Sequence, residues 1–293
     1  MLGGSTLFGA NAPDWETIPA KIQDLANRAL GPNRVSVHNG GISGWTQTQE
    51  LIHLCNLLRR GHRPDIVIFY DGANEIARAT ENLRADGTGM DTKLTDYYEG
   101  GDAFKAQVAE RFDVMGSYAV HYLAEMIRRT RGRPVTFFSG LEKSFYTKTE
   151  RGVQARYQDL SEAEKQALAV EVSKTYLMNC AYMRKLANLY HFEIYFFWQP
   201  LWVDPKHPPK VLTDAESRML HESDPVVDLS KRLRPLILGK DSGVIDLGDS
   251  LKDFRVQLFT DYCHVMPEAN SKIAQDIWKI ISHSSKFPLK RSP

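Results

Sequence analysis

The sequence predicts an α/β fold: a doubly wound parallel sheet in three layers, with helices on both faces. Two runs, 65–70 (DIVIFY) and 193–198 (EIYFFW), are almost continuously apolar, which is typical of strands buried on both faces of a parallel sheet. Helix-like and strand-like segments alternate over the first 75 residues, and polar or glycine-rich motifs follow the strands. The length of 293 residues and the absence of internal repeats favour one domain over 1–293.

Two helices are predicted in the first part of the chain. Apolar residues recur at helical spacing over 17–30, where Thr17 can cap the first turn. The same spacing returns over about 47–60, and here Thr46 and Gln49 form a capping-box pattern.

The strands of this part are short. Residues 34–38 (RVSVH) predict a strand that ends at Asn39, and 65–70 is the buried strand named above. A doubly wound sheet also needs a strand ahead of Ser5, but only four residues precede that serine. We therefore expect a truncated first strand and a start that differs from that of the natural protein. No signal peptide is present in the sequence as given, so the compartment is left open.

The middle of the chain departs from the alternation. Residues 77–190 predict a largely helical elaboration of the same domain, with helical patterning over roughly 104–130 and a short strand over 134–138. A further helix is expected over 161–189, where Ser161 begins a capping box.

The alternation returns near the C-terminus. The buried run 193–198 is followed by a last strand over 243–247 (GVIDL). The final helix is expected to start after Pro267 and to run to about residue 282. The last ten residues are expected to be loose.

Composition excludes several classes of protein. With 37 basic and 36 acidic residues the net charge is +1, so nothing favours a nucleic-acid partner. No run of about 18 apolar residues occurs, so no membrane span is expected. The three cysteines, Cys55, Cys180 and Cys263, are widely spaced, which favours inert thiols over a disulfide framework or a zinc site. The oligomeric state is left open.

Four separated segments together offer the groups that acyl transfer needs. Such a reaction uses a nucleophile, donors for an oxyanion, a base and a carboxylate that orients the base. A serine, a glycine N–H, an amide side chain and a histidine near an aspartate supply these groups in 3–6 (GGST), 39–44 (NGGISG), 72–75 (GANE) and 261–264 (DYCH).

The order of these segments resembles that of the SGNH hydrolases, the GDSL esterase/lipase family. The resemblance extends over the whole chain in motif order, but it is close only at the four segments. It implies the three-layer, flavodoxin-like fold of that family and a serine esterase that needs no metal or organic cofactor. By this resemblance Ser5 is the nucleophile, His264 the base and Asp261 its partner. The oxyanion donors are the N–H groups of Ser5 and Gly44 and the side chain of Asn74.

The chain departs from the family pattern at two positions. Gly4 stands where the family usually has aspartate in the first block, and Glu75 stands where it usually has aspartate after the asparagine of the third block. Neither position carries one of the direct chemical roles, so both leave the expected chemistry in place.

Two further residues are candidate substrate contacts. Trp45 follows the glycine of the second segment and can border the site. Gln199 ends an apolar strand and can line the mouth of a pocket, with a structural hydrogen bond as the alternative. Cys263 stands between the proposed aspartate and histidine without an expected role. His53 and His62 fall on or after a helix and are expected to face solvent.

Other functions are weighed against an esterase. A nucleotide-binding protein is disfavoured because residues 3–9 match neither the G-x-G-x-x-G nor the Gly-Lys-Ser/Thr pattern. A non-catalytic binding relative would keep the fold without turnover. An acyltransferase or a carbohydrate O-deacetylase would use the same serine. The expected partner is a small-molecule, carbohydrate or lipid ester.

Overall fold

The computed structural model describes residues 1–85, 157–202, 224–254 and 258–287. The helical pattern expected over 104–130 and the strand expected over 134–138 lie outside these residues, as does the end of the chain from residue 288 onward. The elements below are those of the described residues.

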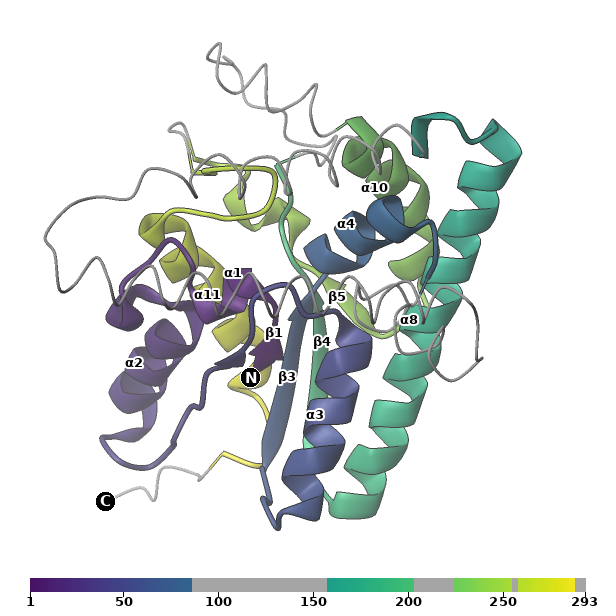
Figure 1. Ribbon diagram of the computed structural model, residues 1–293. Coiled ribbons are helices and arrows are strands. Elements are labelled where there is room, and N and C mark those ends of the chain that lie inside the picture. Colours follow the sequence, from purple (N-terminus) through teal and green to yellow (C-terminus); the bar gives the residue numbers. More distant parts are fainter. Residues whose placement is uncertain (86–156, 203–223, 255–257, 288–293) are drawn as a thin grey trace, which may run out of the picture.

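The core is a five-stranded parallel sheet in the order β2-β1-β3-β4-β5 (Figure 1). This 2-1-3-4-5 order is that of flavodoxin-like doubly wound sheets, in which ligands bind beyond the carboxyl ends of the strands. The strands are β1 Leu2–Gly3, β2 Gly40–Gly41, β3 Ile66–Asp71, β4 Glu193–Trp198 and β5 Val244–Asp246. The predicted α/β class and three of the predicted strands, β3, β4 and β5, are therefore confirmed.

The first strand is short but present. Leu2 and Gly3 pair in parallel with Gly40–Gly41 on one side and with Phe69–Tyr70 on the other. Two residues are thus enough to place the following turn in the interior of the sheet rather than at its edge, although the sequence leaves almost no length for a strand there.

The strand expected over 34–38 is wrong; β2 begins at Gly40 instead. The side chain of Gln23 from the preceding helix takes the backbone groups that a strand would use. Its Oε1 accepts from the Val37 N–H at 2.8 Å, and its Nε2 donates to the Val35 carbonyl at 3.0 Å. The backbone here is satisfied by a side chain rather than by a β-ladder.

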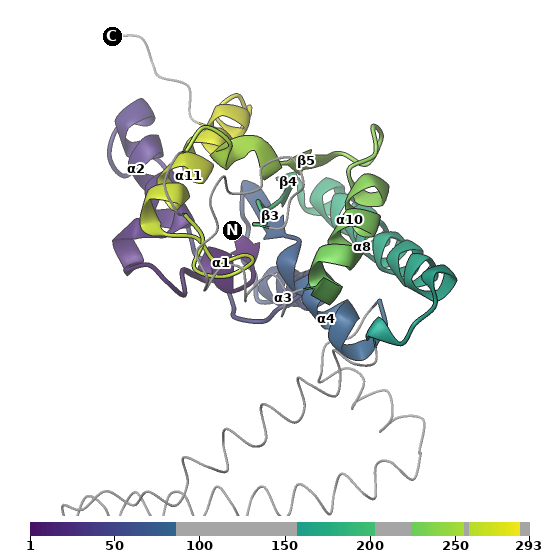
Figure 2. The ribbon, with the colours of Figure 1, turned by 90° about the horizontal axis from the view of Figure 1, so that it is seen from above.

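Helices cover both faces of the sheet, giving three layers (Figures 1 and 2). One face carries α2 Ile18–Leu30 and α11 Pro267–Ile281, which pack on each other. The other carries α3 Gln47–Arg59, α4 Ala73–Asn82, α8 Glu162–Tyr190 and α10 Asp224–Ile237. Two cores of buried apolar side chains fill the spaces between these layers and the sheet. None of the described helices has the length and apolar character of a membrane span.

The capping signals predicted the helix starts correctly. Thr17 accepts from the Ala20 N–H at 3.3 Å at the start of α2. Gln49 accepts from the Thr46 N–H at 3.0 Å at the start of α3, and Ser161 accepts from the N–H of Glu164 ahead of α8. The bonds accepted by Thr17 and Ser161 satisfy N–H groups of the first helical turn, which have no partner within the helix. The bond accepted by Gln49 holds the residue that precedes α3.

Residues 86–156 of the helical elaboration expected over 77–190 lie outside the described residues, and helix α8 packs directly on the sheet. Its buried residues, which include Tyr176 and Met183, lie in the same core as β3 and β4. Helices α4 and α10 are not among the predicted elements. In α10 the signal was present, since Leu229, Leu233 and Ile237 are all fully buried and recur every four residues.

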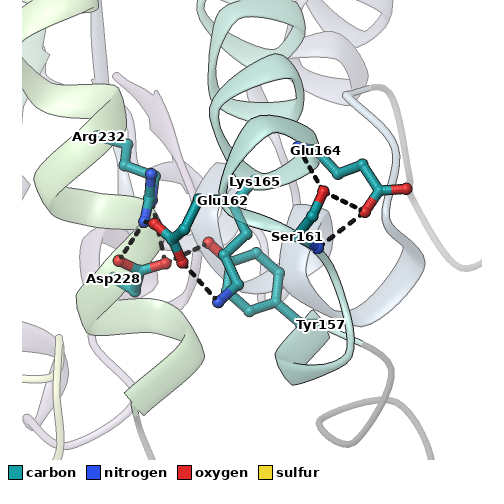
Figure 3. Close-up of polar contacts among 7 residues, drawn as sticks. All are labelled: Tyr157, Ser161, Glu162, Glu164, Lys165, Asp228 and Arg232. Atoms are coloured by element: carbon teal, nitrogen blue, oxygen red, sulfur yellow. Dashed lines mark hydrogen bonds and ion pairs between the residues drawn. The ribbon is translucent and has the colours of Figure 1, made fainter.

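A polar network joins α8 to α10 (Figure 3). Arg232 of α10 holds Asp228 through two hydrogen bonds of 3.1 Å, and its Nη2 reaches Glu162 of α8 at 2.5 Å. The Tyr157 hydroxyl donates to the same aspartate at 3.0 Å. The network holds the outer helices against each other at the rim of the apolar core.

Candidate active site

Three side chains from opposite ends of the chain form a hydrogen-bonded relay. The Oγ of Ser5 lies 2.7 Å from Nε2 of His264, and Nδ1 of His264 lies 2.6 Å from Oδ2 of Asp261. The serine and the histidine are 259 positions apart in sequence. A hydroxyl, an imidazole and a carboxylate thus lie in the order that acyl-transfer chemistry uses.

Ser5 is held by the turn between β1 and α1 Ser5–Phe8. Strand β1 ends at Gly3, and Ser5 opens the short helix with only 8% of its surface exposed. Thr6, the next residue, donates from Oγ1 to Oε1 of Gln199 at 3.0 Å, which ties this helix to the end of β4. The serine therefore lies at the carboxyl edge of the sheet, directly after the end of β1.

His264 and Asp261 lie on a loop that is tied back on itself. Phe259 and Val265 form an antiparallel bridge, and the Thr260 N–H donates to the His264 carbonyl at 2.9 Å. Asn11, in the turn after α1, donates from Nδ2 to Thr260 Oγ1 at 2.6 Å. The loop that carries the base is thereby fastened to the segment that follows the serine.

Asp261 is held ionised by three donors. Its Oδ1 accepts from the N–H groups of Cys263 at 2.9 Å and of His264 at 2.7 Å, and its Oδ2 faces the imidazole. Burial by itself raises the pKa of this carboxyl, but the hydrogen bonds from His264 and Cys263 outweigh it and hold the pKa below its ordinary value of 3.8. A carboxylate in this place fixes the imidazole tautomer and stabilises an imidazolium.

The second segment forms a tight turn next to the serine. The Trp45 N–H donates to the Ile42 carbonyl at 3.2 Å, and Gly44 within this turn has a φ of +75°, a conformation that favours glycine. The Trp45 carbonyl accepts from Nδ2 of Asn74 at 2.7 Å. An amide nitrogen has two hydrogens, so Asn74 keeps a second donor for another acceptor.

The position of Gly4 indicates how closely these segments converge. A Cβ built on Gly4 would lie 2.1 Å from Nδ2 of Asn74 and 3.4 Å from the Trp45 carbonyl. The amide of Asn74 therefore occupies the space beside the residue that precedes Ser5. Glycine at position 4 fits this close approach.

The two candidate substrate contacts differ in their surroundings. Trp45 is half-buried and packs edge-on against His53, with ring centroids 5.4 Å apart. Both His53 and His62 were expected to face solvent. His53 is instead half-buried, whereas His62 is exposed as expected. Gln199 is only 2% exposed and lies beneath the serine turn. Its contact with Thr6 favours the alternative of a structural hydrogen bond over a place at a pocket mouth.

Cys263 lies beside the relay without entering it. Its Sγ is 3.5 Å from Nδ1 of His264, which makes its shorter contact, of 2.6 Å, with Asp261. Burial, followed by the charge of Asp261, raises the pKa of this thiol well above its ordinary value. Asp261, Cys263 and His264 form the one group of metal-ligand side chains that the described residues bring close together, and two of its members are already engaged in the relay.

A second serine has a family-like sequence around it but a different setting. Residues 248–251 read GDSL and form a 3-10 helix, and Ser250 is hydrogen-bonded to Asp276. Ser5, and not Ser250, contacts His264.

The sequence reasoning missed a layer of buried acids beneath the site. Glu50, Asp71 and Glu75 are 0%, 4% and 8% exposed. Burial, then the neighbouring Asp71 charge, raises the pKa of Glu50 well above its ordinary value, and burial also raises the pKa of Glu75. The signal in the sequence was weak, because aspartate and glutamate are usually exposed.

Comparisons with known proteins add little to this geometry. No protein-family model matches the chain, and neither does any curated protein sequence. Among solved structures the chain is similar to LAE5, an alpha/beta hydrolase enzyme from the metagenome of Lake Arreo, Spain, at 12% identity and a TM-score of 0.39. That alignment covers 96% of this chain and 93% of the other. A likeness at this level carries no conclusion about activity.

Proposed function

We propose that this protein is a serine hydrolase of the SGNH type that cleaves carboxylic esters. One observation carries the proposal: Ser5 Oγ, the two ring nitrogens of His264 and the carboxylate of Asp261 are joined by contacts of 2.7 and 2.6 Å. A serine hydroxyl is a weak nucleophile at its free pKa, and a neighbouring imidazole activates it by accepting its proton.

The first half of the reaction forms an acyl-enzyme. Ser5 Oγ attacks the acyl carbon while Nε2 of His264 takes the hydroxyl proton. The carbonyl oxygen becomes an oxyanion, for which the N–H groups of Ser5 and Gly44 and the free amide hydrogen of Asn74 are the donors. His264 then gives its proton to the leaving alcohol as the C–O bond breaks. Asp261 stabilises the imidazolium throughout.

The second half releases the acid. Water attacks the acyl-enzyme as His264 takes one of its protons. As the second tetrahedral intermediate collapses, the bond between the acyl carbon and Ser5 Oγ breaks, and His264 gives this proton to Ser5 Oγ, which leaves free Ser5 and the carboxylic acid. Each step uses only side chains, backbone N–H groups and water. An alcohol that enters in place of water would make the same protein an acyltransferase, because the acyl-enzyme is common to both reactions.

The substrate class follows from the chemistry of the site. The proposed oxyanion donors suit a carbonyl oxygen that gains negative charge during the reaction. Small, carbohydrate and lipid esters all have such an oxygen, so all three belong to the proposed substrate class. A carbohydrate O-deacetylase is one member of this class.

The proposal is tested by labelling purified protein with a fluorophosphonate probe and by measuring hydrolysis of p-nitrophenyl acetate. Ser5→Ala and His264→Ala are expected to lower kcat by about 10⁴–10⁶-fold, and Ser5→Ala to abolish labelling. Ser250→Ala is the matched control and should keep both activities. A wild type that is folded by circular dichroism but inert, or a Ser5→Ala variant that is labelled like wild type, would refute the proposal.

A further inference from the structure

Glu75 is a buried side chain that connects two loops of the candidate site. Its Oε1 accepts from the N–H of Gln47, the first residue of α3, at 2.7 Å, two residues after Trp45 in the turn that contains Gly44. Its Oε2 accepts from the N–H of Gly72, the N-cap of α4, at 2.9 Å, two residues before Asn74. One carboxylate thus joins the end of the loop after β2, which carries Gly44, to the start of α4, which carries Asn74; these are the two proposed oxyanion donors.

We propose that Glu75 is a positioning residue that sets the distance between the two oxyanion donors, Gly44 and Asn74. This inference rests on the proposed function. The Nδ2 of Asn74 already contacts the Trp45 carbonyl at 2.7 Å, so the loops meet at two points, one at the site and one at Glu75 behind it. Two contacts resist rotation of one loop against the other, which a single hydrogen bond does not.

The bond to Gln47 distinguishes this role from ordinary helix capping. Glu75 is the third residue of α4, and its bond to the Gly72 N–H is the capping-box contact. A capping box accepts glutamine as well as glutamate. The second bond spans 28 positions in sequence and leaves the helix altogether. Only a side chain with two acceptor oxygens serves both N–H groups.

Glu75→Gln separates the two roles. The glutamine oxygen can keep the cap on Gly72, while its NH₂ group faces the Gln47 N–H, so that two donors oppose each other. We expect the fold to be kept and the loop that carries Gly44 to move away from Asn74. A displacement of about 1 Å at a catalytic group can cost about 10²-fold in rate.

The experiment compares steady-state hydrolysis of p-nitrophenyl acetate by wild type, Glu75→Gln and Glu50→Gln. We expect Glu75→Gln to lower kcat by about 10–100-fold with KM changed less than about threefold, because oxyanion donors act on the transition state. Glu50→Gln is the matched control, a buried acid of the same layer that is not hydrogen-bonded to either loop's N–H groups in the described residues. Its kcat should stay within about threefold of wild type.

A double-mutant cycle with Asn74→Ala distinguishes the positioning of the oxyanion donors from a merely structural role of Glu75. Once the amide is gone, Glu75→Gln should lower kcat by no more than about fivefold, because one of the two groups that it positions is absent. If Glu75→Gln does not fold, Glu75→Asp replaces it: the shorter acid can cap α4 but does not reach Gln47, and the same loss of kcat is expected.

The outcomes separate this inference from the proposed function. A folded wild type that hydrolyses no ester overturns the proposed function and this inference with it. An active wild type together with unchanged kcat in Glu75→Gln, or an equal loss in the presence and absence of Asn74, overturns the role of Glu75 alone.

Discussion

Replacing Gly4 by alanine is the sharpest steric test of the candidate site. Gly4 has φ −81° and ψ −153°, an extended backbone that alanine also adopts, so the substitution causes no backbone strain of its own. The added methyl group would instead lie 2.1 Å from Nδ2 of Asn74. To reach an ordinary contact distance, that amide has to move by about 1 Å or more, which is the scale on which catalytic groups lose function.

The expected cost is that of one oxyanion donor. Loss of such a donor typically lowers kcat by about 10²–10³-fold, which corresponds to about 2.7–4 kcal/mol of transition-state stabilisation. The amide also loses its 2.7 Å bond to the Trp45 carbonyl as it moves. We expect the drop in kcat with a much smaller change in KM and a nearly unchanged thermal midpoint.

The assay is hydrolysis of p-nitrophenyl acetate by Gly4→Ala, Asn74→Ala and the double variant. Because alanine at position 74 removes the obstructing nitrogen, Gly4→Ala should cost almost nothing in that background. Gly239→Ala is the control, since an added methyl there meets no atom nearer than 4.0 Å. Wild-type kcat in Gly4→Ala, or the same loss on top of Asn74→Ala, would refute the reasoning.

Two further predictions concern stability. Burial, followed by the Asp71 charge, raises the folded-state pKa of Glu50 above its ordinary value of 4.5, so the folded protein keeps a proton that the unfolded chain releases. The free energy of unfolding therefore falls as pH rises from the ordinary carboxyl value toward the raised one. Glu50→Gln should make that fall shallower in urea denaturation between about pH 5 and pH 8, and parallel curves would contradict the assignment. In the network of Figure 3, Arg232→Ala removes the paired hydrogen bonds to Asp228, and a loss of about 0.5–1 kcal/mol is expected from chemical denaturation. An Arg232→Ala variant as stable as wild type would mean that the helix contacts alone hold α10 in place.

The sequence by itself determined the parts whose signals are local. The runs 65–70 and 193–198 form strands because continuous apolar residues need burial on both faces. Thr17, Ser161 and the pair of Thr46 with Gln49 mark helix starts, because a capping side chain acts within three residues of its own position. The four motif segments could be singled out for the same reason: each is a short pattern at the end of a predicted strand or before a helix.

Where local signals compete, the prediction failed. Residues 34–38 have the pattern of a strand, but Gln23, more than ten positions earlier, takes their backbone groups. The two-residue strand at Leu2–Gly3 exists because β2 and β3 pair with it on both sides. Neither outcome can be found in the segment itself, because the deciding partner lies elsewhere in the chain.

The geometry of the candidate site was decided by the tertiary structure alone. The contact between Ser5 and His264 joins residues 259 positions apart, and it depends on the place of β1 between β2 and β3 and on the loop fastened through Asn11 to Thr260. The same holds for Glu75, whose type and helix position predict a cap but whose second bond reaches another loop. Sequence patterns specify which side chains and N–H groups are available to the candidate site. The hydrogen-bond distances between these groups depend on the order of the strands, because that order brings the ends of remote segments together.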